Sequence, residues 1–229
     1  MTTAPSASVT SVRRVIAAIV MLMGAATSAP ANENIAGYFR MYYVQHVAGG
    51  SYTGPLDFLS DAVGAHADAS TLLTASSSRS VIVDRGHGYL QIDDGSGTEQ
   101  ILTLAVYDKA DGGRLLIVGS SNCADGCNFS VEAFVASADR LQPVPRNEVI
   151  PDIGARQFIK PGRPVPRELA AIVPSIDYRP ARLGTTLTLK PWYGYELEEQ
   201  MSRTTRAAIR NVVLDWDARQ GRFVTARGS

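Results

Sequence analysis

The sequence predicts an α+β fold, built mainly from an antiparallel sheet with two or three helices. Short runs rich in β-branched and aromatic residues recur between residues 80 and 135, separated by turns that contain glycine and aspartate. Apolar residues at helical spacing precede these runs, and a later stretch with Glu in its first turn and Arg further on also indicates a helix. The stretch from Pro143 to Pro174 holds seven of the 12 prolines. The chain is therefore either one unit or two halves joined by a Pro-rich crossover.

The first 31 residues have the three parts of a secretory signal peptide. A polar start contains Arg13 and Arg14 but no acidic residue, residues 15–23 are apolar throughout, and small residues follow. Cleavage before Asn32 is favoured, and cleavage before Ala29 is the alternative.

The apolar run is too short to remain as a membrane anchor, because a spanning helix needs about 20 apolar residues. We therefore expect a secreted or periplasmic protein with no stable membrane span after processing. The 22 basic and 22 acidic residues balance, and removal of residues 1–31 leaves a small acidic excess. Nucleic acid is not expected as a partner, because its binding requires concentrated Lys and Arg.

Residues 32–142 form the predicted N-terminal α+β part. Residues 34–47 are rich in aromatic and β-branched residues and predict a strand. Pro55 favours the first position of a helix that extends toward Leu73. Five strands joined by short turns then predict an antiparallel meander; they span residues 80–84, 89–92, 100–107, 114–118 and 129–135.

Residues 143–166 form the Pro-rich crossover, and residues 167–229 form the C-terminal α+β part, which we expect to pack with residues 32–142 as one compact unit. Proline disfavours both helix interiors and central strands, so the crossover is predicted as irregular. The further expectations are a short strand at 157–159, a short helix at 167–173, strands at 175–179 and 185–190, a helix at 196–210 and a hairpin formed by 211–216 and 222–226.

Cys123 and Cys127 are the two cysteines of the chain and flank an Asp-Gly turn. An even number of cysteines in an exported protein indicates a disulfide. The spacing differs from the Cys-X-X-Cys of redox motifs, so we predict a bridge whose purpose is to hold the turn.

The three histidines, His46, His66 and His87, share no metal-ligand spacing, and neither a metal nor a cofactor is expected. His87 lies between two glycines on a predicted turn, where a ligand could approach the backbone closely. It is therefore a candidate binding residue. The sequence contains no nucleophile elbow, phosphate loop or zinc-protease motif.

Trp192, Tyr193 and Tyr195 follow Pro191 between a predicted strand and a predicted helix. Aromatic side chains here either cover the edge of a core or stack on sugars or peptides. They are the remaining candidate binding residues.

Three hypotheses of function follow. The leading one is a binding or accessory module that recognises a protein, peptide or glycan of the cell envelope. The second is a small secreted hydrolase whose site is assembled from His87, Asp84 and a loop serine. The third is a secreted effector or inhibitor of an extracytoplasmic enzyme.

Overall fold

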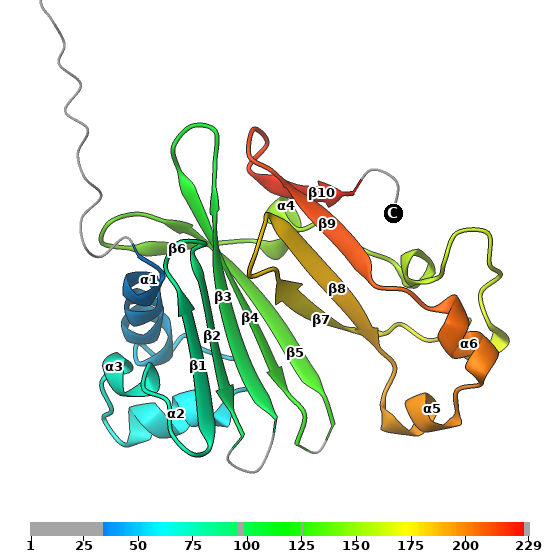
Figure 1. The fold of residues 1–229 in the computed structure, drawn as a ribbon, viewed down its shortest axis with the longest axis horizontal. Helices are drawn as coiled ribbons and strands as arrows, with labels where there is room; N and C mark the ends of the chain where they lie inside the picture. Colours follow the sequence, from blue (N-terminus) through cyan, green and yellow to red (C-terminus); the bar gives the residue numbers. More distant parts are fainter. Residues whose placement is uncertain (1–33, 96–98, 125, 227–229) are drawn as a thin grey trace, which may run out of the picture.

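The structure, a computed structural model, describes residues 34–95, 99–124 and 126–226. The predicted signal peptide, residues 1–31, lies outside these ranges. Within them the chain has the predicted α+β fold, with two antiparallel sheets and several short helices (Figure 1).

In the described ranges the first sheet is a six-stranded meander, in which each strand pairs with the next one along the chain. Its strands are β1 (Arg79–Asp84), β2 (Tyr89–Asp94), β3 (Gln100–Asp108), β4 (Arg114–Asn122), β5 (Asn128–Ala136) and β6 (Leu141–Val144). The second sheet has the order β10-β9-β8-β7; its strands are β7 (Ser175–Pro180), β8 (Thr186–Trp192), β9 (Val212–Asp217) and β10 (Arg222–Thr225). The meander and the final hairpin were predicted, and of the two arrangements that the sequence left open the divided one is observed: the chain leaves the first sheet at the Pro-rich crossover and starts a second.

Six α-helices occur among the described residues, rather than two or three. They are α1 (Ile35–Tyr42), α2 (Asp57–Gly64), α3 (Ala69–Leu72), α4 (Arg146–Val149), α5 (Tyr195–Gln200) and α6 (Arg203–Ala208). A π-helical turn, η2 (Tyr43–Val47), continues α1, and η3 (Ala155–Phe158) and η4 (Arg167–Leu169) are 3-10 turns. The count differs because two predicted helical stretches are each divided into two helices, and because α1 and α4 form where a strand and an irregular segment were predicted.

The predicted strand at residues 34–47 is wrong, since this segment is α1 followed by η2. The side chain of Asn34 accepts a hydrogen bond from the backbone N–H of Gly37 at 3.1 Å and caps the helix. Tyr38 and Tyr42 are one helical turn apart, and both are buried. Aromatic residues that suggested a strand thus occupy one buried face of a helix, where tertiary packing overrides β-propensity.

The predicted helix at 196–210 is interrupted after Gln200, so that α5 and α6 are separate. Met201 is buried in a small cluster with Ile159 and Leu169. Ser202 then caps α6, because its side chain accepts a hydrogen bond from the N–H of Thr205 at 3.1 Å.

The crossover contains more regular structure than predicted. β6 includes Pro143 and pairs only with β5 among the described strands, so it is an edge strand, where proline is tolerated. The strand predicted at 157–159 is instead the end of η3, and only Ile159 makes a β-bridge, with Ile209.

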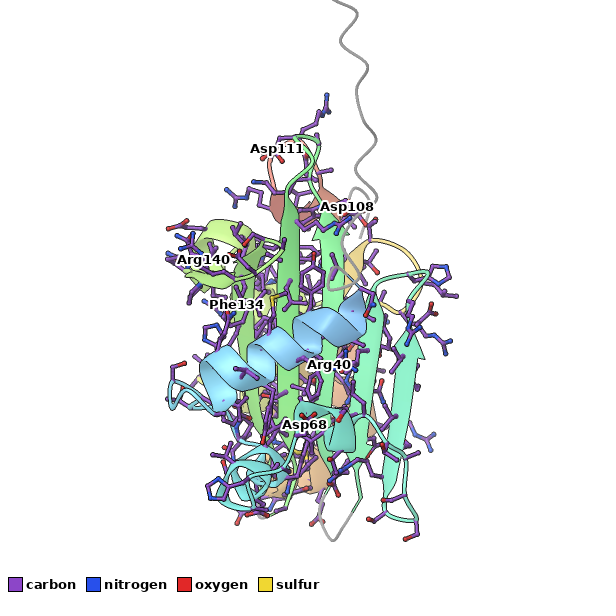
Figure 2. All side chains as sticks on the ribbon, turned by 90° about the vertical axis from the view of Figure 1, so that its left-hand side faces the viewer. Arg40, Asp68, Asp108, Asp111, Phe134 and Arg140 are labelled. Carbon is purple, nitrogen blue, oxygen red and sulfur yellow. A yellow bond between two sulfur atoms is a disulfide. The ribbon has the colours of Figure 1, made fainter. Side chains whose placement is uncertain are left out.

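The first core lies between one face of the first sheet and the helices α1, α2 and α3, which cover it (Figure 2). Tyr38, Phe39 and Tyr42 of α1 pack there with sheet residues such as Leu116 and Phe134. The hydroxyl of Tyr42 donates a hydrogen bond to Glu132 on β5 at 2.5 Å. This face of the sheet therefore carries the first core.

The second core lies between the opposite face of the first sheet and the second sheet. Tyr107, Leu115 and Ile117 of the first sheet meet Leu187 and Leu214 of the second. Val149, Ile150 and Phe158 of the crossover also belong to this core. The N-terminal and C-terminal parts thus share buried apolar side chains, and their junction positions the candidate site.

Candidate functional site

Strand β7 separates the second core from a cleft. Ile176 and Tyr178 pack in the core, whereas the charged side chains of Asp177 and Arg179 line the cleft, where part of Tyr178 is also found. This division follows from the alternation of side chains along a strand. The cleft comprises two adjoining cavities of about 160 and 210 Å³, which share Ser121, Asp177 and Arg179 in their linings.

The floor of the first cavity is formed by uncharged polar groups of the first sheet. Gln91 on β2, Thr103 on β3 and Ser121 on β4 line it, together with Tyr89. The hydroxyl of Tyr89 donates a hydrogen bond to Oε1 of Gln91 at 2.7 Å, and burial raises the pKa of Tyr89. Amide and hydroxyl groups both donate and accept hydrogen bonds, so this floor can satisfy a polar ligand.

The wall of the cleft carries an ion pair. Nε of Arg179 lies 2.5 Å from Oδ2 of Asp177, whose side chain is nearly buried, while that of Arg179 is 52% exposed. Lys190 faces Asp177 in the strand register and also lines the cleft. The buried carboxylate of Asp177 needs the positive charge of Arg179, because an unpaired buried charge would cost free energy of folding.

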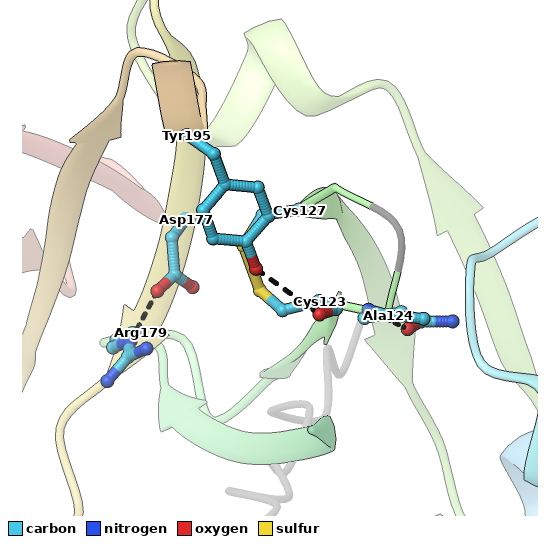
Figure 3. Close-up of a disulfide and its surroundings, with 7 residues drawn as sticks. Cys123, Ala124, Cys127, Asp177, Arg179 and Tyr195 are labelled. Carbon is cyan, nitrogen blue, oxygen red and sulfur yellow. Dashed lines mark hydrogen bonds and ion pairs between the residues drawn. A yellow bond between two sulfur atoms is a disulfide. The ribbon is translucent and has the colours of Figure 1, made fainter. Parts of the chain in front are cut away.

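The predicted disulfide and two of the predicted aromatic residues meet in the second cavity. The sulfur atoms of Cys123 and Cys127 are at bonding distance, 2.12 Å, across the β4–β5 turn. The hydroxyl of Tyr195 donates a hydrogen bond to the carbonyl oxygen of Cys123 at 3.3 Å and lies 3.9 Å from the sulfur of Cys127 (Figure 3). Trp192 packs against Tyr195 edge to face, with ring centroids 5.0 Å apart.

Tyr193 is not part of this cleft lining, unlike the other predicted aromatic residues. Its side chain packs against the cluster of Ile159, Leu169 and Met201. Burial raises the pKa of Tyr193, and the nearby Glu198 adds to this effect. Adjacent residues at the end of β8 thus have different surroundings, Trp192 in the cleft and Tyr193 in a small core.

His87 lies at a different place, in a pocket near the start of α1 that Arg85 and Trp216 also line. Its Nδ1 is 3.0 Å from Oδ1 of Asp84, and Nε of Arg182 donates to the other carboxylate oxygen at 3.0 Å. Arg182, and to a lesser degree His87, lower the pKa of Asp84 to about 2.

The hydrolase hypothesis named no particular serine, and two serines of β4 lie apart from His87. Ser120 and Ser121 line the cleft, whereas His87 and Asp84 belong to the other region. Ser120 also shares a hydrogen bond with Ser130, with their oxygens 2.6 Å apart. Ser120 and Ser121 therefore do not lie in the pocket that contains His87.

Asp177, Arg179 and Gln91 were not singled out from the sequence. The alternation Ser-Ile-Asp-Tyr-Arg at residues 175–179 indicates a strand with one charged face. It does not reveal that this face borders a cleft, because the first sheet that closes the cleft is distant in sequence. Among the described residues no group of three or more His, Cys, Asp or Glu could hold a metal ion.

No family model and no curated protein matches the chain. Among solved structures it resembles a domain of an uncharacterized protein from Porphyromonas gingivalis W83, with a TM-score of 0.50 and 9% sequence identity. The alignment covers 82% of this chain and 98% of that one. At this identity the similarity shows a shared fold. No helix in the described ranges is long and apolar enough to cross a membrane.

Proposed function

We propose that this is an exported binding module of the cell envelope, and that its ligand occupies the cleft between the two sheets. The observation that carries the proposal is the convergence of Trp192, Tyr195 and the Asp177–Arg179 pair on one cleft. Binding sites commonly combine aromatic surface with a few convergent polar groups.

The packing around the cleft supports this proposal. Its floor belongs to the central strands β2, β3 and β4, and its wall is tied to them by the second core. The disulfide holds the β4–β5 turn, and Tyr195 contacts that turn. A preformed site loses less conformational entropy when a ligand binds.

Export is supported by the sequence of residues 1–31 and by the cysteine pair, since disulfides persist in oxidising compartments. Mass spectrometry of the protein from the producing organism tests this part. A mature chain that begins at Asn32, or at Ala29, is expected. Retention of Met1 would contradict export through a cleaved signal.

Hydrogen-exchange mass spectrometry tests the binding function. The mature protein is incubated with a solubilised extract of the native cell envelope. In a parallel sample the extract is first depleted of ligand by passage over the immobilised protein. We expect slower exchange in β7, α5 and the β4–β5 turn, and loss of that protection in Trp192→Ala and in the depleted extract.

Leu183→Ala is the matched control, because Leu183 is 67% exposed and does not line the cleft. This variant should retain full protection. Equal protection of the wild-type protein and Trp192→Ala, or protection confined to other segments, would overturn the proposed site.

A further inference from the structure

We infer that the occupant of the cleft is a short neutral oligosaccharide. This inference rests on the proposed binding function and names the class of ligand. It follows from three properties of the cleft: the balance of its charges, its uncharged hydrogen-bonding floor and its aromatic wall.

The charged residues of the cleft balance. Glu99 and Asp177 are acidic, and Arg179 and Lys190 are basic. Asp177 and Arg179 already neutralise each other at 2.5 Å. Because the four charges of the lining sum to zero, a ligand with a net charge gains no net attraction from the cleft to offset the loss of its hydration. The cleft therefore favours a ligand that is neutral overall.

The floor is suited to hydroxyl groups. Gln91, Thr103 and Ser121 present an amide and two hydroxyls, each of which can donate and accept. Sugar hydroxyls also do both, and they occur along the whole rim of a sugar ring. The exposed guanidinium of Arg179 adds further donors beside this floor.

The wall is suited to the apolar face of a sugar ring. Trp192 and Tyr195 meet edge to face, at an interplanar angle of 84°, and the side chain of Tyr195 remains exposed. The C–H groups of a pyranose face carry a slight positive charge and pack against the negative face of an aromatic ring. A sugar can therefore place the face of its ring against the aromatic wall and its hydroxyl groups against the polar floor.

A peptide fits the cleft less well. An extended peptide usually gains affinity by pairing with the open edge of a sheet. At β7, the strand that borders the cleft, the carbonyl of Tyr178 lies directly against Gly119 of the first sheet. The edge of β7 is therefore occupied by the first sheet at this position, and this disfavours pairing with a peptide backbone there.

The two cavities together reach the low end of the roughly 300–1,000 Å³ that small-ligand pockets occupy. This size suits a few linked sugar rings. The probes are consequently short: tri-N-acetylchitotriose and cellotriose as neutral sugars, glucosamine trimer as the cationic equivalent, and trialanine as a peptide of similar length.

Isothermal titration calorimetry with the mature protein measures binding of each probe. We expect at least one neutral trisaccharide to bind with a Kd below about 1 mM, and to bind at least tenfold more tightly than glucosamine trimer. Trp192→Ala and Arg179→Gln should each weaken that binding at least tenfold. Arg182→Gln is the matched control, because Arg182 lies on the same hairpin and also pairs with an aspartate, but outside the cleft.

The outcomes separate this inference from the proposed function. If envelope extract protects the cleft while neither neutral sugar binds at about 10 mM, the glycan inference fails and the binding function stands. Tighter binding of trialanine than of either neutral sugar would also overturn the inference. If Trp192→Ala and Arg179→Gln bind a neutral sugar as well as Arg182→Gln does, the sugar is bound elsewhere and the inference fails.

Discussion

Gly119 on β4 lies so close to Tyr178 on β7 that a β-carbon at position 119 would be 2.6 Å from the Tyr178 carbonyl oxygen. Real β-carbons do not approach an oxygen so closely. The absence of a side chain at this position therefore allows β7 to cross the first sheet, and this crossing creates both the second core and the cleft.

Gly119→Ala should destabilise the protein by about 1–3 kcal/mol, because the added methyl group forces the two sheets apart. Urea unfolding measures this loss. Gly64→Ala is the control, since a β-carbon there meets nothing within 4 Å and Gly64 ends a helix. That variant should be neutral or slightly stabilising. Equal stability of the two variants would refute the role assigned to Gly119.

Trp192→Ala should leave the fold intact and cost about 1 kcal/mol, mainly from the lost contact with Tyr195. Tyr193→Ala should cost about 2 kcal/mol or more, because Tyr193 packs in a small core. Thermal unfolding and far-ultraviolet circular dichroism compare the adjacent variants. If Trp192→Ala unfolds while Tyr193→Ala stays folded, the assignment of the two side chains is reversed.

Replacement of both cysteines, Cys123→Ser with Cys127→Ser, should preserve the fold and lower stability by about 2 kcal/mol, the amount expected for a very short disulfide loop. The free energy of ligand binding should decrease by more than the free energy of unfolding does, because the turn also positions the Cys123 carbonyl that Tyr195 contacts. Denaturant unfolding and calorimetry measure the two effects. Failure of the double variant to fold would show that the bridge holds more than its own turn.

Alkaline pH should destabilise the protein. Burial raises the pKa of Tyr52 to about 12 and raises that of Tyr107 strongly, and burial with the nearby Glu132 raises that of Tyr42. These hydroxyls stay protonated in the folded protein but ionise near pH 10 when it unfolds. Their stabilisation is complete below about pH 10 and is lost above it, by up to about 1.4 kcal/mol per pH unit for each group.

Urea unfolding between neutral and strongly alkaline pH tests this effect. In Tyr52→Phe the decline of stability between about pH 10 and pH 12 should be shallower than in the wild-type protein. Identical pH profiles for the two proteins would contradict the raised pKa of Tyr52.

Arg182→Gln should raise the pKa of Asp84 from about 2 toward its usual value, because the Arg182 hydrogen bond is the largest cause of the lowered pKa. In the wild-type protein the ionised carboxylate contributes stability above about pH 4, and this contribution is lost as the pH falls through about 2. Carboxyl-carbon NMR follows the titration. Arg163→Gln, at an exposed crossover arginine, should leave the Asp84 pKa unchanged.

The sequence predicted the meander and the final hairpin well, because both depend on local signals. The β-rich runs and the Gly- and Asp-containing turns between them lie close together in the chain. The segment at residues 34–47 was misassigned because its aromatic residues suit either a strand or a buried helix face. Only packing of Tyr38 and Tyr42 on the first sheet distinguishes the two.

The candidate site was predicted in parts. Trp192, Tyr195 and the cysteine pair were each chosen from local sequence, and the structure brings them to one cleft. Tyr195 contacts Cys123 although they are about 70 residues apart in the sequence, and no local pattern predicts a contact over such a separation. Asp177 and Arg179 were missed for the same reason.

The pattern of residues within short stretches of the sequence was enough to predict the α+β class, the antiparallel pairing of neighbouring strands and the disulfide. Each of these features depends on residues that are near one another in the chain. The division into two sheets and the cleft between them required the folded chain. The cleft lies beside the close approach of β7 to Gly119, and this approach is a steric contact between segments that are remote in sequence.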